Sequence, residues 1–84
     1  MSRQDETGQA GSIFHVRLRS SANGGAVTGD WYVRPTAERK FTEWIGTYGS
    51  LDHVVIQLIE ETDAGQETVL KTWTKERGEV VGAL

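Results

Sequence analysis

The chain of 84 residues contains no cysteine, and this absence excludes several chemistries. Neither a disulfide framework nor a thiolate metal site can form, and no cysteine nucleophile is available. The same absence fits a reducing compartment. No run of about 18 apolar residues exists that could cross a membrane. The first ten residues are polar and lack the apolar core of a signal peptide. We therefore expect a soluble, cytoplasmic protein.

Motifs that carry enzyme chemistry are also scarce. The two histidines, His15 and His53, stand among strand-like residues, where a solvated or hydrogen-bonded role is usual. Asp52 and His53 are adjacent on an extended segment and so point to opposite faces, unlike an orienting acid and its base. The glycine-rich stretch 23–29 lacks the lysine of a phosphate-binding loop, and the acidic stretch 60–67 does not match a calcium loop. The sequence therefore predicts no enzyme, no cofactor and no metal site.

One segment has the periodicity of a helix. Apolar side chains recur there at helical spacing between polar residues: Ala37, Phe41, Trp44, Ile45 and Tyr48. Thr36 is expected to cap this helix after Pro35, and Gly49 is expected to end it in the left-handed conformation. Gly46 is expected to let the helix approach the sheet closely. Because the rest of the chain alternates like strands, this one helix must cover a sheet.

Strand-like alternation or composition marks five segments, which are residues 12–19, 30–34, 52–61, 67–75 and 79–84. A flexible loop is expected over residues 20–29, where three glycines occur. Residues 1–11 are expected to form a disordered tail, and residues 12–84 to form a single domain.

Two turns that end in glycine are expected to join the last three strands, each as a three-residue loop with a β-bulge. The pairs that these loops would place opposite each other are Ile59 with Val69, Leu58 with Leu70, Val55 with Trp73, and Lys75 with Glu79. The first face then holds Val54, Ile56, Leu58, Leu70, Thr68, Thr72 and Thr74. Trp73 joins Val55 and Val81 on the second face, as a candidate binding surface. The alternative, that the faces are reversed and Trp73 belongs to the core, stays open.

The predicted class is therefore α+β, with a single helix packed on a four- to five-stranded, mostly antiparallel sheet in the order ββαβββ. Two arrangements fit this order. One resembles a β-grasp, or ubiquitin-like, fold, in which the last long strand lies parallel to the first in the middle of the sheet. The other is a purely antiparallel meander with one helix across it. The resemblance concerns element order alone and does not imply a function.

The net charge of −3 is unevenly distributed. Residues 11–48 carry +2, whereas residues 49–84 carry −4. This difference indicates either charge complementarity within the molecule or a bipolar surface that docks a charged partner.

The interpretation that we favour is a small, non-enzymatic protein–protein interaction module that acts through charged strand surfaces, with another protein or a second copy as partner. The candidate partner-binding residues are Arg17, Arg19, Glu60, Glu61, Asp63, Glu67 and Trp73. The alternative is a single-stranded nucleic-acid-binding domain whose platform would comprise Trp31, Tyr32, Arg34, Arg17 and Arg19. The acidic composition of the chain makes nucleic acid the less favoured partner, because DNA and RNA backbones are negatively charged. A structural subunit of a larger assembly is the third possibility.

Overall fold

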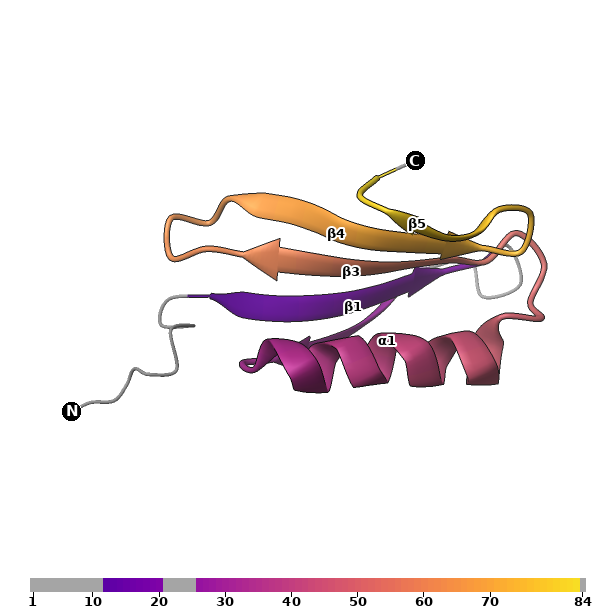
Figure 1. Ribbon diagram of the computed structural model, residues 1–84, viewed down its shortest axis with the longest axis horizontal. Coiled ribbons are helices and arrows are strands. Elements are labelled where there is room, and N and C mark those ends of the chain that lie inside the picture. The colour runs from indigo at the N-terminus through magenta and orange to yellow at the C-terminus, as the bar shows by residue number, and fades with distance from the viewer. Residues whose placement is uncertain (1–11, 21–25, 84) are drawn as a thin grey trace.

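The computed structural model describes residues 12–20 and 26–83. The elements in this part of the chain are β1 (Ile13–Arg19), β2 (Ala26–Trp31), α1 (Arg34–Tyr48), β3 (Val55–Glu61), β4 (Glu67–Thr74) and β5 (Gly78–Val81). The strands form one sheet in the order β2-β1-β3-β4-β5, and each neighbouring pair is antiparallel. The helix lies along one side of this sheet (Figure 1). The predicted α+β class is confirmed, while the predicted tail, residues 1–11, lies outside the described residues.

The sheet is neither of the two expected arrangements in full. The β1 strand pairs with β3 in antiparallel fashion, so the parallel central pair of a β-grasp is not formed. A simple meander is not formed either, because β1 lies between β2 and β3. The helix explains this order. Fifteen helical residues span about 22 Å, close to the length of a seven-residue strand, so the chain returns to the end of the sheet where β2 began. The β2 and β3 strands consequently run parallel to each other on either side of β1.

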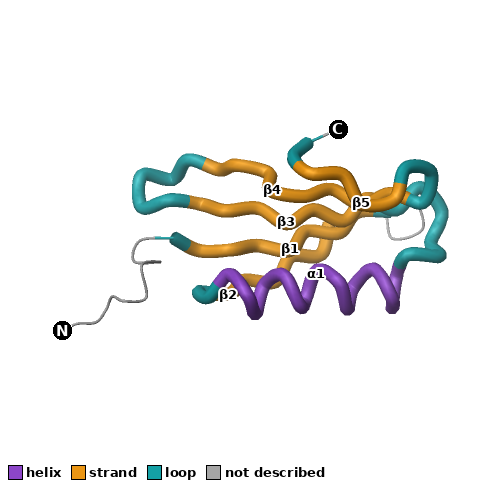
Figure 2. The backbone as a smooth tube through the Cα atoms, viewed as in Figure 1, coloured by secondary structure: helices purple, strands orange, loops and turns teal. Residues whose placement is uncertain are grey.

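The core lies between α1 and the strands β1 and β3. Figure 2 shows the helix running along the sheet. Alternate residues of β1, namely Phe14, Val16 and Leu18, are buried, as the sequence alternation predicts. Val54, Ile56 and Leu58 contribute the same pattern from β3, and Ala37 and Phe41 close the core from the helix. Trp31, Trp44 and Ile45 pack around this centre and are partly buried. The helix stripe predicted from the sequence is therefore the side of α1 that faces the sheet from Ala37 to Ile45, whereas Tyr48 at its end is exposed.

Several predicted boundaries are wrong. The β2 strand begins at Ala26, so its first four residues fall within the segment predicted to be a loop, of which residues 21–25 lie outside the described part. The helix begins at Arg34 with Pro35 in its first turn, where a missing amide proton costs nothing, and Thr36 is not its cap. Gly49 is right-handed, with φ −63°, and not left-handed. The predicted role of Gly46 is also wrong, because it faces open space.

A β-bulge in β4 changes the face that Trp73 occupies. Ile59 is opposite Val69, as predicted, but the register then shifts, and Ile56 rather than Val55 is opposite Trp73. Residues directly opposite each other in an antiparallel pair share a face, so Trp73 lies on the helix side and packs against the core. The predicted pairs of Leu58 with Leu70 and of Val55 with Trp73 are therefore wrong. Trp73 packs against the core, as the alternative held, but the faces are not reversed, because Ile56 and Leu58 lie on the helix side as well.

The same register shift moves Thr72 and Thr74, the residues on either side of Trp73, to the opposite face of the sheet. Thr72 and Thr74 lie opposite Gln57 and Val55, on the side away from the helix. The β4–β5 turn also differs from the prediction, since Gly78 pairs with Thr74 and Glu79 with Trp73. Lys75 lies instead 3.8 Å from Asp52, and Glu79 forms its ion pair with Lys71.

The described residues include no helix with the length and apolar character needed to span a bilayer.

Phe41 is the central side chain of the helix–sheet contact and is fully buried. Replacing it with alanine should destabilise the protein by about 3–5 kcal/mol, because a large cavity would open in a small core. The free energy of unfolding, measured by urea denaturation, checks this expectation. Thr47→Ala, at an exposed position of the same helix, is the matched control and should change stability by less than about 0.5 kcal/mol. Equal effects of the two substitutions would contradict the assigned packing.

Replacement by alanine of each of the two glycines near the end of the helix, Gly46 and Gly49, should change the stability of the protein in opposite directions. A Cβ atom at Gly46 would meet nothing within 4 Å, so Gly46→Ala should stabilise the protein by about 1 kcal/mol through helix propensity. A Cβ atom at Gly49 would lie 2.5 Å from the carbonyl oxygen of Ile45 and 2.9 Å from the Trp73 ring. Gly49→Ala should therefore lower the melting temperature, whereas Gly46→Ala should raise it. Thermal denaturation of both variants tests the pair.

Candidate functional site on the helix-free face

The helix packs on one side of the sheet, and the opposite side carries the charged residues of β1. Because Phe14, Val16 and Leu18 enter the core, the alternate residues His15, Arg17 and Arg19 point away from the helix. We call this side the helix-free face. No helix of residues 12–20 and 26–83 packs over this face. Arg17 and Arg19 are partly or fully exposed there. Ile59 and Thr72 on the same face are buried, and Thr72 donates a hydrogen bond to the carbonyl oxygen of Gly82.

His15 connects the three strands at one end of this face. Its Nδ1 atom lies 2.7 Å from Asp30 Oδ1 on β2, and its Nε2 atom lies 2.7 Å from Glu61 Oε1 on β3. The β1 strand lies between these two strands, so a single imidazole reaches a carboxylate on each side. The side chain of His15 is only 13% exposed, while that of Asp30 is 62% exposed. The imidazole is thus the inner group of a carboxylate–histidine–carboxylate bridge.

The geometry determines the charge state of the imidazole. A neutral histidine offers one N–H donor, whereas two carboxylates need two donors. Burial by itself lowers the pKa of His15, but hydrogen bonds to Asp30 and Glu61 and their negative charges outweigh it and raise the pKa above 6.5. His15 is therefore a cation with both ring nitrogens donating over a wider pH range than an exposed histidine.

A second ion pair lies beside this bridge. Arg17 Nη2 is 3.6 Å from Glu67 Oε2, which joins β1 to β4 across the width of β3. Glu61 and Glu67 face each other directly across the β3–β4 pair, an arrangement of like charges that is unfavourable without a nearby cation. The cations His15 and Arg17 satisfy that need. Three carboxylates and two cationic side chains thus form a single charged cluster.

The predicted site residues lie on both faces of the sheet and in one turn. Arg17, Glu61 and Glu67 come together in the cluster, so the basic edge and the acidic hairpin are parts of one surface and not two separate ones. Arg19 lies on the same face and is exposed. Glu60 lies on the opposite side, where it accepts a hydrogen bond from Ser12. Asp63 is exposed in the β3–β4 turn, and Trp73 lies on the helix side.

Sequence reasoning missed the central residues of the cluster, His15 and Asp30. Period-2 alternation places His15 on the polar face of its strand, but the partner residues depend on pairings that the sequence does not show. The β2 segment that carries Asp30 was expected to begin at that residue, so no register with β1 could be derived. The β1–β3 pairing joins residues that are 46 positions apart, and no local pattern signals it.

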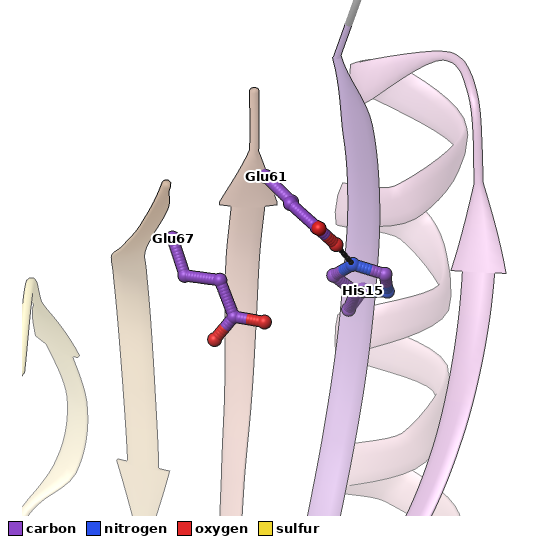
Figure 3. Close-up of side chains that lie close together, drawn as sticks. All are labelled: His15, Glu61 and Glu67. Atoms are coloured by element: carbon purple, nitrogen blue, oxygen red, sulfur yellow. Dashed lines mark hydrogen bonds and ion pairs between the residues drawn. The ribbon is translucent and has the colours of Figure 1, made fainter. Parts of the chain in front are cut away.

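The cluster also has the composition of a metal-binding group. One ligand atom from each of His15, Glu61 and Glu67 lies within 4.8 Å of the others. Figure 3 shows these side chains on adjacent strands, with the Glu61 carboxylate reaching His15 and the Glu67 carboxylate beside them. Imidazole and carboxylate are common ligands of divalent transition metals.

A shallow hollow of about 320 Å³ adjoins the cluster at the end of the sheet. Its lining residues are Ser12, Ile13, Tyr32, Glu61, Thr62 and Asp63. Glu61 is shared by the hollow and the histidine bridge, so a molecule bound there would contact the charged cluster.

Comparisons of the chain with protein-family models, with curated proteins and with solved structures found no match.

The histidine bridge should make stability depend on pH with a defined sign. Because the pKa of His15 is higher in the folded state than the unfolded value of 6.5, its contribution is fully present below that value and is lost as pH rises through the folded pKa. Urea unfolding between pH 6 and 9 should show wild type losing its advantage over His15→Gln as pH rises. Glu61→Gln should also lower the imidazole titration midpoint measured by NMR. An identical pH dependence in wild type and His15→Gln would contradict the assignment.

Proposed function

We propose that the protein is a non-enzymatic, cytoplasmic interaction module that binds another protein through its helix-free face. The observation that carries this proposal is the charged cluster itself, in which side chains from four strands hold one another in position on the face of the sheet that carries no helix. Charges that are oriented before binding cost less to order when a partner arrives, and they select partners of complementary charge.

The edge of the sheet supports the same proposal. The β2 strand lies at one margin, and its outer side has no neighbouring strand among the described residues. Val27 on this strand and Tyr32 and Val33 just after it are exposed, at 52%, 72% and 49% respectively. Exposed apolar side chains at a strand edge next to a polar face resemble the mixed composition of protein interfaces.

The nucleic-acid alternative receives less support from the geometry. Trp31 is opposite Phe14 on the helix side and contacts Trp44 edge-to-face at 6.2 Å, whereas Arg17 lies on the helix-free face. Arg17 and Arg34 are also engaged by Glu67 and Glu38. The aromatic and basic residues of the expected platform are therefore divided between two faces, and a continuous stacking surface is not assembled.

Charge reversal at Arg19 tests the proposal with little risk to the fold. Arg19 is exposed on the helix-free face, and the described residues provide it with no ion pair. Arg39 has the same properties on the outer side of the helix, so Arg39→Glu is the matched control. The proposed partner carries an acidic group opposite Arg19 beside the basic group that faces the cluster. A protein captured from the native host by wild type should therefore associate with Arg19→Glu about fivefold more slowly, because roughly 1 kcal/mol of attraction between Arg19 and that acidic group is lost. Biolayer interferometry measures the association rate.

The remaining outcomes distinguish the alternatives. Equal binding by both variants would show that the helix-free face does not direct the contact. Nuclease-sensitive capture would favour nucleic acid. Concentration-dependent sedimentation of the purified chain, weakened by Arg19→Glu alone, would identify a second copy as the partner.

A further inference from the structure

We propose that His15, Glu61 and Glu67 form a binding site for a divalent transition-metal ion, with zinc as the best-fitting ion. The inference is independent of the proposed function. It starts from ligand chemistry: one imidazole and two carboxylates come from three adjacent strands, and their donor atoms lie within 4.8 Å of one another. Three protein ligands around zinc leave the fourth tetrahedral position to water, as in open zinc sites.

Asp30 supplies the outer support that such a site needs. Metal-bound histidines usually donate their second ring N–H to a carboxylate, which fixes the tautomer and the orientation of the ring. Asp30 Oδ1 lies 2.7 Å from Nδ1 of His15, so this contact is in place. With Nδ1 held as the donor, Nε2 is the nitrogen that points toward Glu61 and Glu67. The ion would take the place of the Nε2 proton.

The ion requires the two glutamate side chains to rotate, because donor atoms that now lie within 4.8 Å of one another have to come to a common separation of about 3.3 Å. Nε2 of His15 lies 2.7 Å from Glu61 Oε1, while two ligands on a tetrahedral zinc ion lie about 3.3 Å apart. Glu61 therefore needs to withdraw by about 0.6 Å, which is within the range of rotation of a partly exposed side chain. Glu61 and Glu67 face each other across β3 and β4, so the ion would also relieve the repulsion between them.

The choice of ion follows from the donors. An imidazole favours zinc, copper, nickel and iron, whereas calcium and magnesium select all-oxygen sites. Arg17 competes with the ion, because its guanidinium lies 3.6 Å from the Glu67 carboxylate. Because Arg17 and the metal ion compete for Glu67, removal of the Arg17 side-chain charge should strengthen metal binding.

The experiment is isothermal titration calorimetry of the full chain with zinc chloride, in a non-chelating buffer, with calcium chloride as the comparison ion. Wild type should bind one zinc ion per chain and should show no saturable heat with calcium. His15→Gln and Glu67→Gln should each weaken zinc binding at least tenfold, and Asp30→Asn should weaken it about 10- to 100-fold. Arg17→Gln should tighten it.

His53→Asn is the matched control. His53 has a positive φ of 55° in the turn before β3, a conformation that asparagine also tolerates, so this variant removes a histidine without disturbing the cluster. Its zinc affinity should equal that of wild type. Circular dichroism confirms that each variant folds, and Glu67→Gln, at an exposed position, keeps the test decisive if His15→Gln does not fold. No saturable zinc binding by wild type, or equal loss in His53→Asn and His15→Gln, would overturn the proposal.

Discussion

The length of the helix is the constraint on which the rest of the structure depends. Because α1 runs back along the whole sheet, β3 enters parallel to β2, and β1 is held between them. The helix remains on that path because Phe41 and Ala37 pack into the apolar residues of β1 and β3. The central position of β1 then determines the chemistry of the opposite face. A histidine on an edge strand could reach a carboxylate on one side only, whereas His15 reaches Asp30 and Glu61 on both sides.

Alternate residues of β1 thus contribute to two different parts of the molecule, the apolar core on one face and the charged cluster on the other. Phe14, Val16 and Leu18 supply apolar area to a core in which each large side chain matters, since an 84-residue domain buries little surface. His15 and Arg17 supply charge to the other face, where their partners come from β2, β3 and β4. The β-bulge in β4 extends this division. By moving Trp73 to the helix side, it adds an aromatic ring to the core, and it leaves the small residues Thr72 and Thr74 on the helix-free face.

The features that the sequence predicted correctly are those that depend on the spacing of apolar residues within one helix or strand. The stripe through Phe41 and Trp44 identified the helix and its inner side, and the alternation of residues 13–19 identified β1 and its buried face. The errors arose where the answer depends on contacts between distant segments. Insertion of β1 between β2 and β3 is a consequence of tertiary packing, and a one-residue bulge is invisible to a count of turn residues. Gly49 was predicted from the usual conformation of helix ends, whereas its real constraint is the nearness of Ile45 and the Trp73 ring. For the candidate site, Arg17, Glu61 and Glu67 were identified by charge, but their convergence around His15 was not.

The charge balance of the cluster connects its stability with the ligands it can accept. Three carboxylates meet two cationic side chains, so the cluster keeps a negative excess even with His15 protonated. A deprotonated His15 would leave Glu61 and Glu67 facing each other with Arg17 alone between β1 and β4 to offset them. Any cation that enters, whether a proton, a metal ion or a basic side chain of a partner, therefore meets the same unbalanced carboxylates. A metal ion and a basic partner residue would compete for Glu67, which already shares Arg17. Because the cluster carries a negative excess of one charge, a metal ion and a basic partner residue would exclude one another there.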